Sequence, residues 1–336
     1  MEIAQLEARL NRLHPLSLPH LPTPLEPLPQ LTARLGGPEI WVKRDDQTGL
    51  ATGGNKTRKL AFLMAEALAQ ETDVVLTAGA PQSNHARQTA AAAARLGLAC
   101  VLVLGGREPS PPPQGNLLLD RLLGAEVRWA GDRPLAEALA AEAEAERRAG
   151  RRPYVIPFGG SNARGAAGYV AAMAELWRQA QALGVAFDGM VLASSSGGTQ
   201  AGLLVGARAL GYEGRILGIS IMEGAESFRL RIAKLASETA ALLGLEITIS
   251  PDEVLLRDDY LGAGYAVVGD LEREAIRLAA QTEGLLVDPV YTGRALGGLV
   301  DLIRRGEFRA GQRILFWHTG GTPALFAYAD ALVGPG

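Results

Sequence analysis

Short apolar runs alternate with longer amphipathic or alanine-rich segments from about residue 53 onward. The apolar runs predict strands at residues 73–78, 99–104, 189–193, 216–220 and 313–317. The segments with helical spacing cover residues 59–70, 84–97, 115–124, 134–149, 164–182, 198–210, 225–243, 270–283 and 294–305. Strands of a parallel sheet are buried on both faces, so they read as continuous apolar runs, and their crossovers need helices of this length. The pattern therefore predicts a doubly wound α/β fold.

The N-terminal segment of residues 14–29 is rich in proline, with leucines between the prolines. Proline fixes φ and lacks the amide hydrogen that a helix needs, so this segment predicts an extended arm. The leucines favour an arm that wraps against the fold over a disordered tail. Glycine-rich segments at residues 151–165 and just before Lys56 indicate domain boundaries. We predict a large domain of residues 1–55 and 161–336 with residues 56–160 inserted as a small domain.

Composition narrows the class of protein. A chain of 336 residues, 48% hydrophobic and 21% charged, is long enough for two lobes and ordinary for a globular fold. The formal net charge of -3 gives no strong attraction to nucleic acid or to an anionic membrane, so we expect neither as a partner. The single cysteine, Cys100, excludes an intramolecular disulfide, and no cluster of ligands has zinc spacing.

The sequence offers neither a typical membrane-spanning segment nor a typical secretory signal. The longest uncharged run, residues 189–207, carries hydroxyl and amide side chains in its middle, which a membrane-spanning helix rarely has. The N-terminus is acidic and amphipathic, unlike a secretory signal. We therefore expect no transmembrane segment and a cytoplasmic location.

The first candidate for chemistry is the glycine turn TGGNKTRKL at residues 52–60. Its glycines let the backbone approach a ligand, and Lys56 falls at a predicted helix N-terminus. The helix dipole disfavours a cation there, so Lys56 either extends into solvent or is retained for a reason. Taken alone, a solvated lysine is the commoner case.

The second candidate is SSSGGTQAG at residues 194–202, between an apolar strand and a helix. Its backbone amides and hydroxyl groups, together with the helix dipole, predict a phosphate-binding loop. The spacing matches neither the GxGxxG of dinucleotide sites nor the GK[ST] of ATP-binding loops. The structural alternative is a plain tight turn between strand and helix.

The third candidate is GAPQSNHARQ at residues 79–88. Ser83 and Asn84 are good N-cap residues, and that structural role can coexist with ligand binding. His85 has no acidic partner nearby in the sequence, and the GxSxG nucleophile elbow of Ser/His hydrolases is absent.

Two further segments carry hydroxyl groups, the first at a predicted loop-to-helix junction and the second at the carboxyl end of the last strand, the edge where ligands gather in open α/β sheets. They are DPVYTGRAL, with Tyr291 and Thr292, and FWHTGGTPALF, with Thr319. Taken alone, Tyr291 reads as a packed, hydrogen-bonded tyrosine. Together, a lysine beside a glycine turn, a separate phosphate loop and these hydroxyl groups predict a pyridoxal phosphate site, with Lys56 as the Schiff-base lysine.

The order of GGNK, QSNH, SSSGGTQAG, DPVYTG and HTGG resembles the family of 1-aminocyclopropane-1-carboxylate deaminase and D-cysteine desulfhydrase, within the tryptophan synthase β-like, fold-type II pyridoxal phosphate enzymes. The resemblance extends from TPLEPL and WVKRDD, at residues 23–28 and 41–46, to the terminal helix. It implies a two-lobed fold of open, twisted, mostly parallel sheets flanked by helices, with the cofactor in the cleft between the lobes. It also implies a homodimer.

The resemblance implies roles for single residues. Lys56 would hold the cofactor, and Tyr265 and Tyr291 would lie over the substrate. The substrate carboxylate and a neighbouring cofactor oxygen would be received by Ser83, Asn84 and His85. The remaining cofactor-binding positions would be Ser195, Ser196, Gly197, Gly198, Thr199, Thr292 and Thr319.

These inferences predict β-elimination on a small sulfur amino acid, with D-cysteine giving pyruvate, ammonia and hydrogen sulfide and with Lys56 accepting the α-proton. The alternatives are ring-opening deamination of 1-aminocyclopropane-1-carboxylate, sulfite release from L-cysteate, and a non-catalytic pyridoxal phosphate carrier. In the ring-opening deaminases the positions that match Thr292 and Thr319 are a glutamate and an apolar residue. A threonine at position 292 leaves the pyridine nitrogen less protonated than a glutamate would, which favours sulfur elimination.

Overall fold

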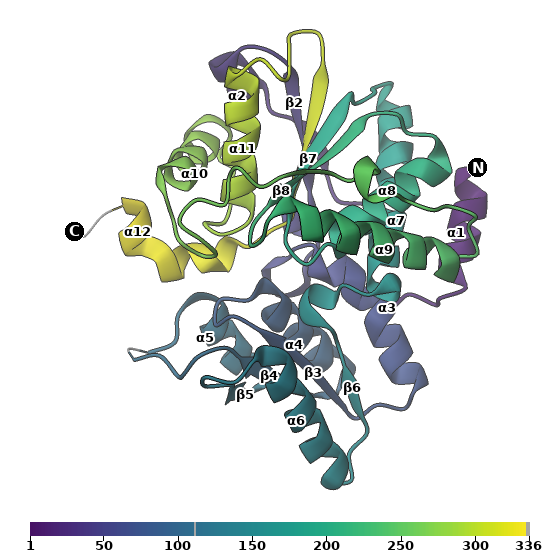
Figure 1. Cartoon of the computed structure of the whole chain (residues 1–336), viewed down its shortest axis with the longest axis vertical. Helices are drawn as coiled ribbons and strands as arrows, with labels where there is room; N and C mark the ends of the chain where they lie inside the picture. Colours follow the sequence, from purple (N-terminus) through teal and green to yellow (C-terminus); the bar gives the residue numbers. More distant parts are fainter. Residues whose placement is uncertain (111, 334–336) are drawn as a thin grey trace.

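The computed structural model describes residues 1–110 and 112–333, which form two lobes around two sheets (Figure 1). The larger sheet has six strands in the order β1-β2-β10-β7-β8-β9, and only β1 and β2 pair antiparallel. The smaller sheet has four parallel strands in the order β5-β4-β3-β6. The strands are β1 (Leu25–Pro27), β2 (Glu39–Arg44), β3 (Val74–Gly79), β4 (Ala99–Leu104), β5 (Glu126–Trp129), β6 (Pro153–Val155), β7 (Gly189–Ser194), β8 (Arg215–Ser220), β9 (Leu255–Arg257) and β10 (Arg313–His318). The predicted α/β class with mostly parallel sheets is confirmed.

Helices flank both sheets (Figure 1). They are α1 (Ile3–Asn11), α2 (Pro29–Leu35), α3 (Lys56–Ala69), α4 (Asn84–Leu96), α5 (Gly115–Leu122), α6 (Leu135–Arg148), α7 (Ala163–Leu183), α8 (Gly198–Leu210), α9 (Ala225–Leu242), α10 (Asp270–Glu283), α11 (Thr292–Arg304) and α12 (Ala329–Val333). Every predicted helix and strand is present. The apolar pattern missed β1, β2, β5, β6 and β9, because these strands are very short or have charged residues at their ends.

The proline-rich arm is free of helix between α1 and β1, as predicted. It ends in β1, an edge strand, where a proline is tolerated because its missing amide hydrogen is not needed in the ladder. Leu18 and Leu28 are buried, so the arm is anchored against the fold at both ends. No helix of the described chain is both long and apolar enough to cross a bilayer.

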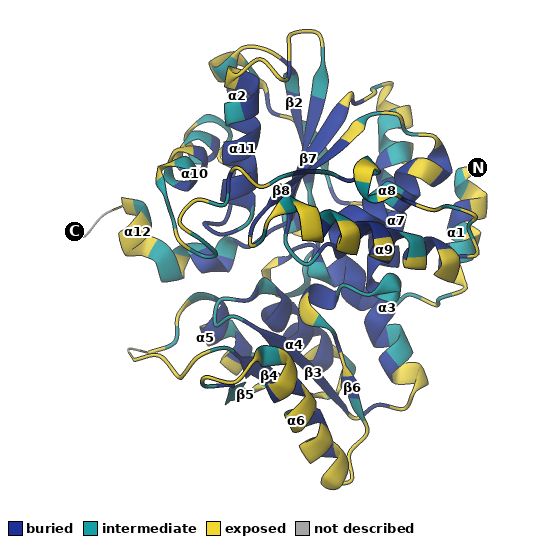
Figure 2. Cartoon of the chain, in the orientation of Figure 1, coloured by how far each residue is buried: buried dark blue, intermediate teal, exposed yellow. Residues whose placement is uncertain are grey.

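Helix α3 belongs to the cores of both lobes. Its Ala61 and Phe62 pack in the hydrophobic core of the large lobe, whereas Leu60, Leu63 and Met64 pack in that of the small lobe. Figure 2 shows the first half of α3 and the central strands β3, β4, β7 and β8 as mostly buried, with exposed residues on the outer faces of α6 and α9. Lys56, at the start of α3, therefore lies where the lobes meet. All strands of the smaller sheet fall within residues 56–160, and the exact domain boundaries stay a prediction.

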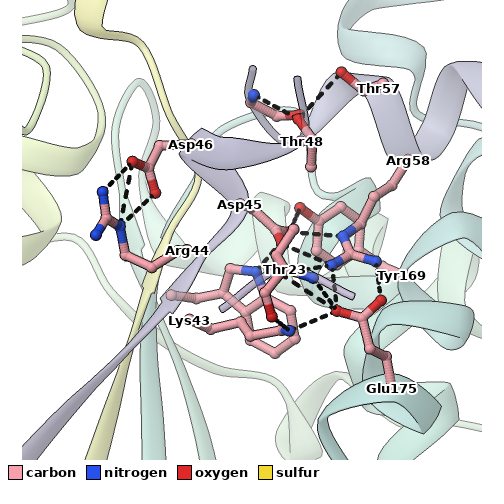
Figure 3. Close-up of polar contacts among 12 residues, drawn as sticks. Thr23, Lys43, Arg44, Asp45, Asp46, Thr48, Thr57, Arg58, Tyr169 and Glu175 are labelled. Atoms are coloured by element: carbon pink, nitrogen blue, oxygen red, sulfur yellow. Dashed lines mark hydrogen bonds and ion pairs between the residues drawn. The ribbon is translucent and has the colours of Figure 1, made fainter. Parts of the chain in front are cut away.

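A cluster of buried charges joins β2, α3 and α7 (Figure 3). Arg58 Nη2 donates to Asp45 Oδ1 and to Glu175 Oε1, both at 2.8 Å. Lys43 Nζ donates to Glu175 Oε1 at 2.5 Å. Each of the two cations thus contacts a carboxylate, and the two positive and two negative charges balance within the cluster.

Asp45 is the most heavily contacted member of this cluster. It accepts hydrogen bonds from Thr23 Oγ1 at 3.0 Å, Tyr169 Oη at 2.6 Å and Trp317 Nε1 at 2.8 Å. Burial alone would raise the pKa of Asp45, but Arg58, Lys43 and the Tyr169 hydroxyl together outweigh burial and hold this pKa below its ordinary value. The cluster fixes the arm, β2, α3, α7 and β10 to one another.

Candidate active site

A cavity lies between the lobes, where the C-terminal ends of β3, β7 and β10 face the N-terminal ends of α3, α4 and α8. Most of the predicted site residues line it: Lys56, Ser83, Asn84, His85, Ser195, Ser196, Gly197, Thr199, Tyr291 and Thr319. Gly198, Tyr265 and Thr292 do not line it, but each adjoins or contacts a residue that does. Segments far apart in the sequence therefore meet at one ligand edge, as parallel sheets require.

Lys56 is the first residue of α3 and follows a tight turn in which Gly53 and Gly54 have φ of +72° and +128°. A side chain at Gly54 would place its Cβ 3.3 Å from the Thr319 carbonyl oxygen, so glycine permits this close approach. Lys56 Nζ donates to Asn55 Oδ1 at 2.9 Å. Burial lowers the pKa of Lys56 to about 8, although the nearby Asp288 carboxylate opposes the shift. More of the Lys56 amine is therefore unprotonated near neutral pH than of an ordinary lysine, which favours a nucleophile.

The predicted phosphate loop enters α8 through Gly197, whose φ is +86°. Asn55 Nδ2 donates to Thr199 Oγ1 at 3.1 Å, which ties the loop to the residue before Lys56. Ser161, a residue that sequence reasoning missed, accepts from the Gly198 amide at 3.2 Å and donates to Ser196 Oγ at 2.7 Å. The first-turn amides of a helix lack intrahelical partners, so the start of α8 offers donors to an anion.

Lys59 lies beside this loop and was also missed. Its side chain is fully buried, and Nζ donates to the Gly159 carbonyl oxygen at 3.1 Å and to Ser161 Oγ at 3.0 Å. A Cβ placed on Gly198 would lie 2.9 Å from Nζ, so the amine lies against the loop. The apolar run LAFLM directly after Lys59 is the feature of the sequence that could have indicated its burial, because a helix that is apolar on all sides is buried.

Within the described residues Lys59 makes no ion pair with a carboxylate. Burial, and secondly the charge of Lys56, lower the pKa of Lys59 well below its ordinary value. A buried cation without an anion is costly, and a dianionic phosphate bound in the loop would supply the missing partner. The donor set therefore fits a phosphate at one end of the cavity and a carbonyl group at Lys56 at the other, which are the two ends of pyridoxal phosphate.

The start of α4 supplies hydrogen-bond donors on the opposite wall. Ser83 Oγ accepts from the Ala86 amide at 3.1 Å and so caps the helix, while its hydroxyl hydrogen remains available to a ligand. A Cβ on Gly79 would lie 2.6 Å from Ser83 Oγ, so the end of β3 must be glycine. The capping and ligand-facing roles of this loop coexist.

His85 is neutral in this site. Burial, together with the charges of Lys56 and Lys59, lowers the pKa of His85 well below its ordinary value. Its Nε2 lies 3.0 Å from Thr77 Oγ1, and that hydroxyl donates to the Ile156 carbonyl oxygen at 2.9 Å. Nε2 therefore carries the ring hydrogen and Nδ1 is an acceptor. In this tautomer Ser83 and Asn84 are the donors for an anionic group, and the role of His85 toward a substrate carboxylate stays a prediction that requires the other tautomer.

Two tyrosines and a buried carboxylate lie near the start of α11. Tyr265 Oη and Tyr291 Oη are 2.6 Å apart, and burial raises the pKa of both phenols, so both stay protonated. Thr292 Oγ1 donates to Asp288 Oδ1 at 2.7 Å and accepts from the Asp288 amide at 2.7 Å. The hydroxyl hydrogen of Thr292 is thus already used within the protein, which the sequence did not indicate.

Comparisons with known proteins agree with this geometry. A family model described as pyridoxal-phosphate dependent enzyme matches residues 16–320. A D-cysteine desulfhydrase of Klebsiella pneumoniae is 46% identical over 327 residues, covering 95% of this chain and 97% of the relative. A 1-aminocyclopropane-1-carboxylate deaminase of Burkholderia vietnamiensis is 43% identical over 323 residues, covering 92% and 94%.

Solved structures give the same result for the fold. The structure of a homologue of ACC deaminase superimposes with a TM-score of 0.91 at 40% identity, and the match covers 99% of both chains. A threonine deaminase of Solanum lycopersicum matches with a TM-score of 0.69 at 18% identity, covering 100% of this chain and 90% of that one, which concerns the fold alone.

Proposed function

The chain belongs to the family of pyridoxal-phosphate dependent enzymes, and on this premise we propose that it catalyses β-elimination of a small sulfur amino acid, with D-cysteine as the preferred substrate. The balanced reaction consumes D-cysteine and water and releases pyruvate, ammonia and hydrogen sulfide. The observation that carries the proposal is the position of the Lys56 amine, whose pKa is lowered by burial, across one cavity from an anion-binding loop. Among its relatives, one named D-cysteine desulfhydrase supports the choice of substrate.

The cofactor supplies an electron sink that weakens the bonds to the α-carbon of a bound amino acid. Lys56 would hold it covalently, while Thr199, Ser196 and Lys59 would bind its phosphate. The Lys56 amine would also be the group that accepts the α-proton of the bound substrate. A pKa of about 8 suits that task, because a general base works best when its pKa is close to the pH at which it operates.

The opposite wall would orient the substrate. The Ser83 hydroxyl and the Asn84 amide would donate to the substrate carboxylate and to a cofactor oxygen. The phenol of Tyr291, held by Tyr265, would donate a hydrogen bond above the substrate. These contacts would place the α-hydrogen toward Lys56, and such orientation contributes much of the rate in enzymes that act on small substrates.

Deamination of 1-aminocyclopropane-1-carboxylate is the second candidate, because a relative of similar identity carries that name. The absence of a glutamate at position 292 argues for sulfur elimination. The Thr292 hydroxyl hydrogen is itself donated to Asp288, and of Thr292 and Thr319 it is Thr319 that lines the cavity. A thiolate is a good leaving group and tolerates a weaker electron sink than the cleavage of an unactivated carbon–carbon bond. L-Cysteate and a purely carrier role are further outcomes of the test below.

The test is a parallel assay of the holoenzyme at saturating substrate. Pyruvate is followed for D-cysteine, L-cysteine, D-serine and L-cysteate, and ammonia for 1-aminocyclopropane-1-carboxylate. Free pyridoxal phosphate and the Lys56→Ala variant measure the background. We expect D-cysteine to be turned over fastest. Faster release of ammonia from the cyclopropane acid would overturn the assignment, and no turnover above background would support a carrier.

We further propose that the protein acts in the cytoplasm as a homodimer. The resemblance described above suggests the dimer, and a single cysteine, buried in β4, suits a reducing compartment. Light scattering coupled to size-exclusion chromatography measures the mass in solution. A mass equal to one chain of 35.3 kDa would contradict the dimer.

A further inference from the structure

The side-chain amide of Asn84 has a fixed orientation. Its Oδ1 accepts two hydrogen bonds, from Arg87 Nη1 at 3.0 Å and from Asn116 Nδ2 at 2.9 Å. A carbonyl oxygen has two lone pairs, so Oδ1 is saturated. Its Nδ2 lies 2.9 Å from the Cβ that a side chain at Gly321 would have, and makes no hydrogen bond to any described residue. The amide hydrogens therefore face the large lobe across the cavity.

Arg87 is the main cause of this orientation. Its side chain is fully buried in α4, and Nη1 also donates to Asn116 Oδ1 at 2.6 Å. Asn116 is in turn held by the Gln82 backbone carbonyl, which accepts from its Nδ2 at 2.9 Å. Rotation of the Asn84 amide would set its NH2 group against the Arg87 guanidinium, which has only donors. The two donors at Oδ1 thus exclude the flipped amide.

The same guanidinium reaches the turn that carries Lys56. Arg87 Nη2 donates to the Gly53 carbonyl oxygen at 2.8 Å. Arg87 makes no ion pair within the described chain, and the carboxylates that face it are Asp120 on α5 and Asp288 near α11. Both oxygens of Asp120 are buried without a hydrogen-bond partner in the described part of the chain. The burial of a full charge is thus compensated mainly by neutral acceptors, which is an expensive way to hold a helix in place.

We propose that Arg87 is a positioning residue that keeps the Asn84 amide aimed as a donor at the phenolic oxygen of the bound cofactor and ties it to the Lys56 turn. The inference deepens the proposed function, because it concerns the same site. Its readout does not depend on which amino acid is turned over. A purely structural arginine would affect stability alone, whereas a positioning arginine must act through Asn84.

The absorbance of the lysine-bound cofactor, titrated with pH, separates these two roles. A donor at the phenolic oxygen withdraws negative charge from it, and that oxygen stabilises the proton on the neighbouring nitrogen that joins the cofactor to Lys56. Loss of the donor should raise the apparent pKa of the absorbance change by about 1 to 2 units, as expected for one hydrogen bond to a charged oxygen. We expect this rise in Arg87→Met and in Asn84→Ala, with kcat/KM lowered about tenfold or more.

The double variant Arg87→Met/Asn84→Ala is decisive. If Arg87 acts through Asn84, the apparent pKa of the double variant shifts by the same amount as that of Asn84→Ala alone, because the two effects are then not additive. Additive shifts, or a wild-type titration in Arg87→Met, would overturn the proposal. Arg95→Met, an exposed position on the same helix, is the matched control. Should Arg87→Met fold poorly, Asn116→Ala removes one of the two donors to Asn84 and should give a smaller shift in the same direction, whereas a wild-type titration there would count against the proposal.

If no substrate is turned over but the absorbance behaves as described, the proposed function fails and the role of Arg87 stands. If turnover occurs while the titrations of Arg87→Met and wild type coincide, the proposed function stands and the role of Arg87 fails.

Discussion

The molecule buries two groups of cations in opposite ways. In the cluster of Figure 3, Lys43 and Arg58 each pair with a carboxylate, so the charges balance inside the protein. Around the cavity Lys56, Lys59 and Arg87 are buried or nearly so, and none makes an ion pair with another described residue. Unpaired buried charge is costly. A balanced cluster supports the fold, whereas unbalanced positive charge marks the place where an anionic ligand completes the structure.

Lys56→Ala tests the unbalanced group most strongly. We expect loss of turnover to background and loss of the visible absorption of the bound cofactor, because no other lysine among the described residues lines the cavity. Absorbance spectra and the pyruvate assay measure both effects. Lys234→Ala, an exposed lysine on α9, is the control. Retained absorption in Lys56→Ala would place the attachment elsewhere.

Glu175→Gln tests the balanced group. It removes the carboxylate shared by Lys43 and Arg58, and breaking a buried pair from one side costs about 3 to 5 kcal/mol of unfolding free energy. The loss should be equal with and without cofactor, and the cofactor dissociation constant should not change. Urea unfolding of both forms measures it. Glu144→Gln, in exposed pairs on α6, should cost less than about 1 kcal/mol. A large change in cofactor affinity in Glu175→Gln would contradict the assignment of this cluster to the fold alone.

Lys59→Met should affect the cofactor-bound protein and the apoprotein differently. We expect cofactor binding to weaken by about 1.5 to 3 kcal/mol, the value of a hydrogen bond to a charged group. The apoprotein should be as stable as the wild type or more so, since the substitution removes a buried amine that lacks an anion. Equilibrium dialysis gives the affinity and thermal unfolding the stability, with Lys234→Met as control. Equal destabilisation of both forms would show that Lys59 belongs to the fold.

The pH dependence of apoprotein stability tests the desolvation of the Lys56 amine. The folded pKa of Lys56, about 8, lies below that of an unfolded lysine, about 10.4. Between these values the unfolded chain binds more protons at this position, so the unfolding free energy rises with pH. The stability of wild-type apoprotein relative to Lys56→Ala should therefore increase from pH 8 to pH 10. A flat or falling difference would mean that the amine is not desolvated.

The sequence predicted those parts of the site that lie at glycine or serine turns before a helix. Ser83 and Thr199 also follow strongly apolar strands, which reveal the ligand edge, whereas Lys56 is marked by its glycine turn alone. Lys59 and Arg87 lie inside helices, where a lysine or arginine looks the same whether it is solvated or buried. Burial depends on which helix faces the neighbouring lobe covers, and that is decided by tertiary packing.

Thr292 shows a second limit of prediction from the sequence. The sequence predicts a loop-to-helix junction at this residue, but it cannot say that Asp288 takes the hydroxyl hydrogen. Hydrogen-bond direction depends on distances of a few tenths of an ångström, which spacing along the chain does not encode. The tautomer of His85 was hidden for the same reason, because Thr77 and Ile156 come from other segments.

The shared helix α3 makes the attachment of the cofactor depend on both lobes. Its side chains are embedded in both hydrophobic cores, so Lys56, its first residue, is held by the packing of the large and the small lobe together. A substitution that loosens either core should therefore disturb the position of the Lys56 amine, even when it lies far from the cavity.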